Sequence, residues 1–282
     1  MTTETIPWGD PRLPQLFREI PERDRPQQLY IKGSLPPADA LIVSVVGSRY
    51  PTSDALRTAE QIGAALGRAG VVVASGLALG CDAAAHKGAL TSGSPVIAVL
   101  GSGCDDASIA PKTNLHLAHK VIAHGCLLSE YPDGTIAAPW QFPARNRFLA
   151  GMSRAVIVIE ATAKSGSLIT ARLALDYGRD VYALPSGLWS SSGEGTNMLI
   201  HHGATIVPSI AQLLDDLDLA PAESRFSNHP QRELLSLLHE PRALDELLDI
   251  ITIPRADLIN MLTVLEIEGA IKIENGKYIA TT

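Results

Sequence analysis

Short apolar segments rich in β-branched residues recur along this 282-residue chain, and helical patterns lie between most of them. Strands that are apolar on both faces and alternate with helices predict a parallel sheet with helices on both sides. We therefore expect a Rossmann-like α/β core at residues 41–218, preceded by a lead-in segment at 1–40. The predicted strands are 41–46 (LIVSVV), 71–75 (VVVAS), 96–100 (VIAVL), 126–129 (CLLS), 155–160 (AVIVIE), 181–185 (VYALP) and 204–207 (ATIV).

Turns that contain glycine or serine follow five of these predicted strands. In a parallel sheet such turns meet at the carboxyl edge, which is where open α/β sheets bind their ligands. The dinucleotide fingerprint Gly-x-Gly-x-x-Gly does not follow the first strand, so the sequence does not predict a standard NAD site. The five turns are Gly47-Ser48-Arg49, Gly76 with Gly80, Gly101-Ser102-Gly103, Lys164-Ser165-Gly166-Ser167 and Ser186-Gly187.

The junction that follows the strand at 155–160 holds one cation, two hydroxyls and a glycine, in the order Lys164, Ser165, Gly166 and Ser167. A helix N-terminus presents unpaired N–H groups and a partial positive charge, which together attract anions. Glycine and serine let a ligand approach that backbone closely, so a phosphate is the expected guest. In the alternative interpretation, one of the two serines only caps the helix.

The net charge of −7 is unevenly distributed along the chain. Residues 1–40 carry 5 basic and 6 acidic side chains, residues 41–210 carry 12 and 11, and residues 211–282 carry 6 and 13. The acidity therefore belongs to the C-terminal part, and a local basic patch on the core is compatible with the acidic total. We expect Arg49, Arg145, Arg147 and Lys164 in loops of the core, and the alternative is scattered, solvated charge.

Several kinds of protein are excluded by what the sequence lacks. No apolar run reaches about 18 residues, and no basic region followed by an apolar one opens the chain, so neither a membrane-spanning helix nor a signal peptide is predicted. The three cysteines lie far apart, at Cys81, Cys104 and Cys126, and an odd count argues against a disulfide framework. We expect a reduced cytoplasmic protein with no structural zinc and no membrane contact.

Four motifs resemble the DNA-processing protein A family (DprA, also called Smf), in the family's order and over about residues 10–210. Many members carry a helical SAM-like domain before the core, and this domain is expected to be missing here because only about 40 residues precede the core. The loop at 101–117 departs from the family pattern, which usually has Tyr-Pro where Ile109, Ala110 and Pro111 stand. The motifs are 45–52 (VVGSRYPT), 75–90 (SGLALGCDAAAHKGAL), 142–187 (FPARNRFLAGMSRAVIVIEATAKSGSLITARLALDYGRDVYALPSG) and 195–207 (GTNMLIHHGATIV).

The resemblance implies a protein that binds single-stranded DNA, protects incoming DNA during natural transformation and loads the RecA recombinase onto it. It also implies a homodimer, no enzymatic activity and no cofactor. The DNA is expected in a positively charged pocket at the sheet edge. The positions matched to the family and expected to contact DNA are Gly47, Ser48, Arg49, Arg145, Asn146, Arg147, Lys164, Ser165, Gly166 and Ser167.

Other chemistry-bearing residues have two interpretations each. Asp82 and His86 stand four apart and are either an acid–base pair or a device that fixes their helix against the neighbouring loop. His201 and His202 lack further ligands at metal-binding spacing. Aromatic side chains either stack on bases or pack in the core and anchor loops, and the candidates are Trp140, Phe142 and Trp189.

Residues 219–282 predict a small second domain, joined by a linker at 221–230. Three helical patterns precede a segment at 270–281 that alternates around Asn275-Gly276, a hairpin signal, so a winged helix is expected. Its candidate recognition helix holds Asp257, Glu266 and Glu268 against Arg255. Because carboxylates repel phosphate, we favour a protein-contact or structural role over DNA binding. The helical patterns are 232–240, 243–251 and 254–269.

A second class of function is a nucleotide-processing enzyme of the phosphoribohydrolase-like Rossmann group. Those relatives use the motif Pro-Gly-Gly-x-Gly-Thr-x-x-Glu and need a carboxylate just inside the helix. Residues 165–175 contain no Asp or Glu, which counts against this alternative.

Overall fold

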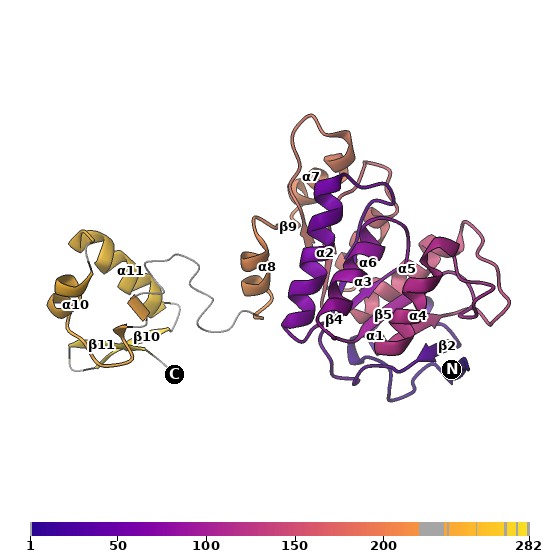
Figure 1. Ribbon diagram of the computed structural model, residues 1–282, viewed down its shortest axis with the longest axis horizontal. Helices are drawn as coiled ribbons and strands as arrows, with labels where there is room; N and C mark the ends of the chain where they lie inside the picture. Colours follow the sequence, from indigo (N-terminus) through magenta and orange to yellow (C-terminus); the bar gives the residue numbers. More distant parts are fainter. Residues whose placement is uncertain are drawn as a thin grey trace. The chain divides into compact units, whose positions relative to one another are not determined.

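The chain divides into two compact units, Met1–Ile210 and Ala211–Thr282 (Figure 1). The computed structural model describes residues 2–219, 234–235, 237–251, 253–267, 270–274 and 276–280. The division falls slightly before the boundary predicted at residue 218, and the predicted linker at 221–230 lies outside the described residues.

A nine-stranded sheet forms the centre of the first unit and confirms the Rossmann-like α/β fold. Its strand order is β1-β2-β6-β5-β4-β3-β7-β8-β9, and neighbouring strands from β6 to β9 pair in parallel. Every residue of β3 to β7 is buried, as expected for strands covered by helices on both faces. The strands are β1 (Glu4–Pro7), β2 (Gln28–Gly33), β3 (Ile42–Val46), β4 (Val72–Ser75), β5 (Val96–Leu100), β6 (Cys126–Ser129), β7 (Ala155–Val158), β8 (Asp180–Ala183) and β9 (Thr205–Ile206).

Helices cover both faces of this sheet (Figure 1). The connections through α2, α3 and α4 step along the sheet in one direction, and the one through α6 steps in the other. Because such crossovers are right-handed, the two sets lie on opposite faces, and α2 packs on α3 while α5 packs on α6. The helices are α1 (Gln15–Arg18), α2 (Ser53–Arg68), α3 (Cys81–Thr91), α4 (Leu115–His124), α5 (Gln141–Met152), α6 (Ser167–Asp176), α7 (Glu194–His201) and α8 (Ile210–Asp216), with short 3-10 turns η1 (Glu22–Asp24), η2 (Lys112–Asn114) and η3 (Ser191–Gly193).

The lead-in segment at 1–40 is part of the sheet and makes it mixed. Its strands β1 and β2 pair antiparallel with each other, and β2 pairs antiparallel with β6. Phe17 of α1 is fully buried, and its ring meets that of Phe148 edge to face, with 5.2 Å between the centroids. The sequence pattern predicted neither β1 nor β2. Only one of the four residues of β1 and two of the six residues of β2 are buried, which leaves no apolar run to detect.

The direction of the chain through the sheet reverses beside β3. The chain leaves β3 through β4, β5 and β6, and then crosses back to place β7 on the other side of β3. The loops after β3 and β7 therefore leave the sheet side by side and turn away from each other. Such a switch point opens a crevice at the carboxyl edge, where α/β sheets bind ligands.

The second unit has its own small core of leucine and isoleucine side chains. It contains α10 (Leu244–Ile250), α11 (Arg255–Ile267) and a hairpin of β10 (Ile271–Glu274) and β11 (Lys277–Ala280). The hairpin prediction is confirmed, with Glu274 paired to Lys277. Part of the first predicted helix and Asn275 lie outside the described residues, so the winged helix stays a prediction. The fully buried core residues are Leu234, Leu238, Leu247, Leu258, Leu262, Leu265 and Ile271.

Candidate functional site

An open pocket of about 520 Å³ lies at the carboxyl edge where β3 and β7 meet, and we call it the switch-point pocket. Eight of the ten residues predicted to contact DNA line it, and the two exceptions are Arg147 and Lys164. The lining residues are Val46, Gly47, Ser48, Arg49, Tyr50, Ala78, Asp82, Phe142, Pro143, Arg145, Asn146, Leu149, Thr162, Ser165, Gly166, Ser167, Thr170 and Ser192.

The turn after β3 brings backbone very close to α3. A Cβ atom at Gly47 would lie 2.7 Å from the Cys81 Sγ atom, so only glycine fits there. The Ser48 carbonyl accepts a hydrogen bond from the Cys81 N–H (3.1 Å), and the Ser48 hydroxyl accepts one from the Tyr50 N–H (3.1 Å). The Ser48 N–H donates to the Cys81 sulfur, whereas the Arg49 N–H has no acceptor among the described residues. This turn therefore offers one backbone donor, that of Arg49, at the wall of the pocket.

Arg49 is an exposed cation at the mouth of the switch-point pocket. Its guanidinium carbon lies 5.1 Å from the centroid of the Phe142 ring, within the range of a cation–π contact. Within the described part of the chain, no carboxylate lies within ion-pair distance of Arg49. Its charge and its N–H groups are available for a phosphate, which arginine binds through charge-assisted hydrogen bonds.

The first turn of α6 forms the opposite wall. Gly166 is the N-cap residue and has no side chain, but the Ser165 hydroxyl accepts a long hydrogen bond from the Ser167 N–H (3.4 Å), in line with the capping alternative. The hydroxyls of Ser165 and Ser167 lie 2.7 Å apart. Asn146 of α5 donates to the Gly166 carbonyl (3.3 Å) and holds the turn in place. The partial positive charge of the α6 N-terminus thus faces the same pocket as Arg49.

Arg145 forms the floor of the pocket and is only 5% exposed. Its guanidinium donates to the carbonyls of Gly76 (2.8 Å) and Val99, and its Nε donates to the Asn146 Oδ1 atom (2.9 Å). A Cβ atom at Gly76 would overlap the guanidinium, so the glycine after β4 exists to seat this arginine. Arg145 therefore organises the pocket and adds buried positive charge beneath it.

Asp82 and His86, four residues apart on α3, are both buried, and Asp82 lines the pocket beside Arg145. The Asp82 Oδ2 atom accepts a hydrogen bond from the Gly76 N–H (3.0 Å) and lies 3.8 Å from Arg145 Nη2, so Asp82 fixes α3 against the neighbouring loop as predicted. Burial raises the pKa of Asp82, lowers the pKa of Arg145 to about 10 and lowers the pKa of His86 to about 4. Near neutral pH, Arg145 is therefore charged and His86 is neutral.

The prediction that Arg145 and Arg147 lie in loops is wrong, since both belong to α5. Polar residues here stand on buried positions of the helix, so the apolar periodicity that marks a helix is absent. Pro143 also suggests a break, but it stands in the first turn, where the missing N–H removes no helical hydrogen bond.

Arg147 and Lys164 lie outside the switch-point pocket. Arg147 donates to the Asp24 carbonyl (2.9 Å) and to the Glu130 carboxylate (2.7 Å), so it ties α5 to the lead-in segment. Lys164 is exposed and lines a second hollow, between α6 and α7. A DNA contact by either residue stays a prediction, and Arg147 has protein partners for each of its guanidinium nitrogens.

Glu160 is an organising residue that the sequence analysis missed. It is a buried carboxylate just past β7, and it accepts hydrogen bonds from the Thr52 hydroxyl (2.8 Å) and the Ser192 hydroxyl (3.2 Å). It thereby joins the loop after β3 to the turn before α7 at the rim of the pocket. The available signal was a single acidic residue at the end of an otherwise apolar strand, AVIVIE.

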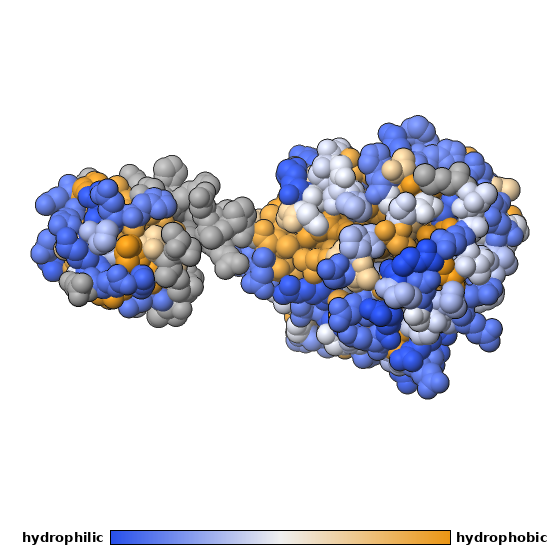
Figure 2. All heavy atoms as spheres, turned by 90° about the horizontal axis from the view of Figure 1, so that it is seen from below, coloured by the Kyte–Doolittle hydropathy of each residue, from blue (hydrophilic) through white to orange (hydrophobic). Residues whose placement is uncertain are grey.

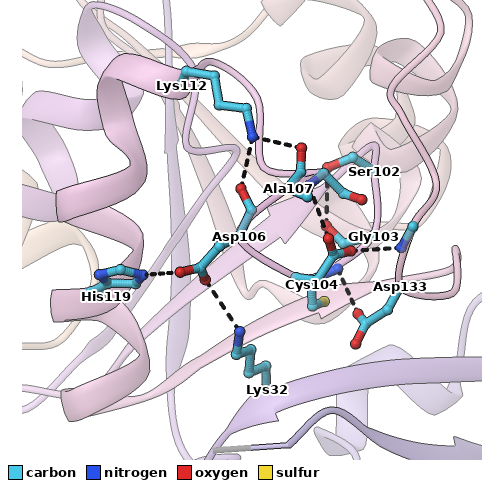
Figure 3. A network of polar contacts seen from close by, with 12 residues as sticks. Lys32, Ser102, Gly103, Cys104, Asp106, Ala107, Lys112, His119 and Asp133 are labelled. Carbon is cyan, nitrogen blue, oxygen red and sulfur yellow. Dashed lines mark hydrogen bonds and ion pairs between the residues drawn. The ribbon is translucent and has the colours of Figure 1, made fainter.

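The loop at 101–117, where the sequence departs from the family pattern, is held by its own polar network (Figure 3). Asp106 contacts Lys32 (3.4 Å) and His119 (2.9 Å), and the hydrogen bond from His119 is the main reason that the pKa of Asp106 is lowered. Asp105 accepts hydrogen bonds from the N–H groups of Gly134 (2.7 Å) and Ser108 (3.1 Å). No residue of this loop lines the switch-point pocket.

The three candidate stacking aromatics have different surroundings. Phe142 lines the switch-point pocket beneath Arg49. Trp140 is largely exposed but meets the Tyr131 ring edge to face. Trp189 is 94% exposed, so neither core packing nor loop anchoring accounts for it.

The two adjacent histidines of α7, His201 and His202, meet edge to face with 5.2 Å between the ring centroids. In the part of the chain that the structure describes, no group of three His, Cys, Asp or Glu residues could hold a metal ion. Within those same ranges, every helix is too short or too polar to cross a membrane.

A family model described as DNA recombination-mediator protein A matches residues 4–218. The chain belongs to this family. The DNA recombination-mediator protein A match covers the whole sheet and the switch-point pocket, and it confirms the resemblance drawn from the sequence motifs.

Two curated relatives are similar in sequence to this family member over most of its length. Protein Smf of Synechocystis sp. is 43% identical over 216 residues, which are 75% of this chain and 53% of that protein. Protein Smf of Escherichia coli is 34% identical over 271 residues, which are 91% of this chain and 72% of that protein. The chain thus spans about half the length of the Synechocystis relative.

Two solved structures share the fold. The X-ray structure of DNA processing protein A from Streptococcus pneumoniae matches with a TM-score of 0.68 at 36% identity, over 76% of this chain and 74% of that one. DNA processing protein A from Helicobacter pylori matches with a TM-score of 0.66 at 32% identity, over 77% of this chain and 96% of that one. The latter structure is described for its single-stranded DNA binding mode.

Proposed function

We propose that this protein is a non-enzymatic binder of single-stranded DNA, and that the switch-point pocket holds a phosphate of the strand. The observation that supports the proposal is that several segments meet at this one pocket. Residues from the loop after β3, from α5 and from the start of α6 form one pocket. It combines a helix N-terminus with Arg49, whose N–H has no acceptor and whose guanidinium has no ion-pair partner among the described residues. Family membership and the single-stranded DNA binding described for the Helicobacter pylori relative support the same conclusion.

The kind of contact available favours a single strand over a duplex. Backbone N–H groups, hydroxyls and a few cations recognise phosphates, which carry no sequence information. A single strand can bend its phosphates into a concave edge, whereas duplex DNA is stiff over about 150 base pairs. The helix α11 of the second unit carries one arginine, Arg255, and two carboxylates, Asp257 and Glu266, which is a poor match for a DNA groove.

The direct test is a titration of labelled oligo-dT against a duplex of equal length. We expect oligo-dT to bind much more tightly than the duplex, with little dependence on base sequence. Equal affinity for both would contradict the proposal.

The homodimer is part of the proposal and has a candidate surface. A hollow of about 800 Å³ between α6 and α7 is lined mainly by apolar side chains. Figure 2 shows apolar side chains gathered on one face of the first unit. The exposed apolar side chains of α6, α7 and β9 are Ile169, Leu175, Met198 and Ile206. When one pocket of a dimer has bound a strand, the second pocket meets that strand at a high effective concentration. The affinity for an oligonucleotide should therefore rise steeply once it is long enough to span both pockets. The apolar lining residues of the hollow are Ala163, Leu168, Ile169, Leu173, Leu175, Met198 and Leu199.

The cellular role that we propose is the one implied by the family: a cytoplasmic protein that protects incoming DNA in natural transformation and loads the RecA recombinase onto it. The test is assembly of recombinase filaments on a strand already covered by a single-strand-binding protein. This protein should shorten the lag before assembly, and an unchanged lag would contradict the loading role.

The nucleotide-processing alternative makes a different prediction. A phosphoribohydrolase would release free base from a nucleoside monophosphate, which requires a carboxylate near the sugar. The first turn of α6 has none, and Glu160 is already held by Thr52 and Ser192. Asp82, the carboxylate that lines the pocket, is held by the Gly76 N–H and Arg145. Incubation with nucleoside monophosphates should therefore yield no free base, and measurable release would favour the enzyme.

A further inference from the structure

The turn between β8 and α7 exposes two large apolar side chains, Leu188 and Trp189. Leu188 is 85% exposed and Trp189 is 94% exposed. Scattered apolar residues are common on surfaces, but tryptophan carries the largest apolar area of any side chain and is normally well buried. Two adjacent large apolar side chains at the tip of one turn therefore indicate a surface that binds a ligand.

The turn that carries them is well defined. The Ser190 N–H donates to the Gly187 carbonyl (2.9 Å), so Leu188 and Trp189 occupy the two central positions of a tight turn. Asn197 of α7 closes the base of the turn, because its side chain bonds both the N–H and the carbonyl of Ser186 (3.0 Å each). Central turn positions usually hold glycine, proline, asparagine, aspartate or serine, so turn formation does not explain leucine and tryptophan here.

The same turn reaches the switch-point pocket. Ser192 lines the pocket, and its hydroxyl donates to Glu160. Three residues along the chain span at most about 11 Å, so the backbone of Trp189 lies within that distance of Ser192. At about 3.4 Å per stacked nucleotide, this reach corresponds to about three nucleotides of a bound strand.

We propose that Trp189 is a stacking platform for an unpaired base of the strand whose phosphate binds in the switch-point pocket. This inference rests on the proposed function. The pocket supplies phosphate contacts, and a strand that leaves it presents bases with bare apolar faces. The exposed indole of Trp189 matches such a face, and stacking of this kind tolerates any base.

A nucleobase fits this turn better than a protein partner does. The residues around the two apolar side chains are small and polar, since Ser186, Gly187 and Ser190 flank them. A protein interface needs a much broader contact, of about 800 Å² on each side. Sites for single-stranded nucleic acid usually combine a cationic groove with aromatic side chains on which bases stack. An exposed indole within reach of a phosphate pocket matches that combination.

The experiment compares the full-length protein with its W189A and L188A variants, each titrated with two strands. One strand is oligo-dT, and the other has the same length and phosphates but abasic residues. L188A is the matched control, because Leu188 is also largely exposed in the same turn but has no aromatic face. We expect W189A to weaken oligo-dT binding by about 5- to 150-fold and to leave the abasic strand unchanged. L188A should change neither affinity.

Other outcomes distinguish a failure of the stacking role from a failure of the proposed function. Unchanged oligo-dT affinity in W189A would overturn the stacking role while leaving the proposed function intact, and it is also the result expected if the turn serves a protein partner. An equal loss for both strands, or an equal loss in L188A, would overturn it too, because neither depends on a base meeting the indole. Failure of the unmodified protein to bind oligo-dT at all would instead overturn the proposed function.

Discussion

Arg49 and Lys164, at the carboxyl edge of the core, are exposed and have no carboxylate within ion-pair distance among the described residues. In the second unit, by contrast, each basic residue that the structure describes lies between 2.7 and 3.8 Å from a carboxylate oxygen. The pairs are Arg242–Glu240, Arg255–Asp245, Lys272–Glu274 and Lys277–Glu246.

This difference shows why the total charge is a poor guide to ligands. The 13 acidic and 6 basic residues of 211–282 account for the whole net charge of −7. They neutralise cations within their own unit, while the core keeps free cations beside a helix N-terminus. A phosphate responds to that local potential, so an acidic protein can present a site for DNA.

The largest expected effect on stability comes from Arg145, which differs from the exposed cations of both units because it is buried. Arg145→Ala should lower the free energy of unfolding by about 3–5 kcal/mol, because it leaves Asp82 buried without its partner. Arg255→Ala, which breaks an exposed pair of the second unit, should cost no more than about 1 kcal/mol. Urea denaturation of the two variants measures both values. Similar losses would show that burial does not distinguish these arginines.

The next effect is on the pH dependence of stability. The pKa of His86 is about 4 in the folded protein, below the ordinary value of 6.5, so the unfolded chain binds more protons between these values. Stability should therefore fall as the pH drops from 6.5 to 4, by roughly 3 kcal/mol from this residue. His86→Leu should flatten the dependence in that window. Denaturation curves at pH 4.5 and 7.5 test this, and parallel losses in both proteins would rule out His86 as the cause.

A smaller effect is expected from removing the second unit. A chain that ends at residue 218 should bind oligo-dT as tightly as the full chain, or up to about threefold more tightly, because most of the negative charge is gone. Fluorescence anisotropy with labelled oligo-dT measures the change. A large loss of affinity would mean that the second unit contacts DNA despite its paired cations.

Much of the core follows from the sequence because its signals are local. Apolar strands buried on both faces predicted the parallel part of the sheet. Of the five predicted turns at the carboxyl edge, those after β3 and β7 line the switch-point pocket and the other three do not. The glycines are readable for a physical reason, since Gly47 and Gly76 leave no room for a Cβ atom. Eight of the ten predicted contact residues consequently lie in one pocket.

The features of the site that the sequence did not predict depend on contacts between segments that are distant along the chain. No local pattern shows that Arg147 is engaged by Glu130 and the lead-in segment, so its charge looked available. A polar helix face such as that of α5 is recognisable only when its partners are known. Similarly, Trp189 resembles any loop tryptophan until its exposure is measured.

The central claim is that the carboxyl edge of the core binds the phosphates of a single strand through its free cations. The most direct measurement is the salt dependence of oligo-dT affinity for the unmodified protein, R49A and R68A. Arg68 is a matched control, because it is an exposed cation at the end of α2, at the opposite edge of the sheet. R49A should make the slope of log affinity against log salt shallower by about 0.7, the value for one phosphate contact on a single strand, and R68A should leave it unchanged. Identical slopes for R49A and the unmodified protein would contradict the account.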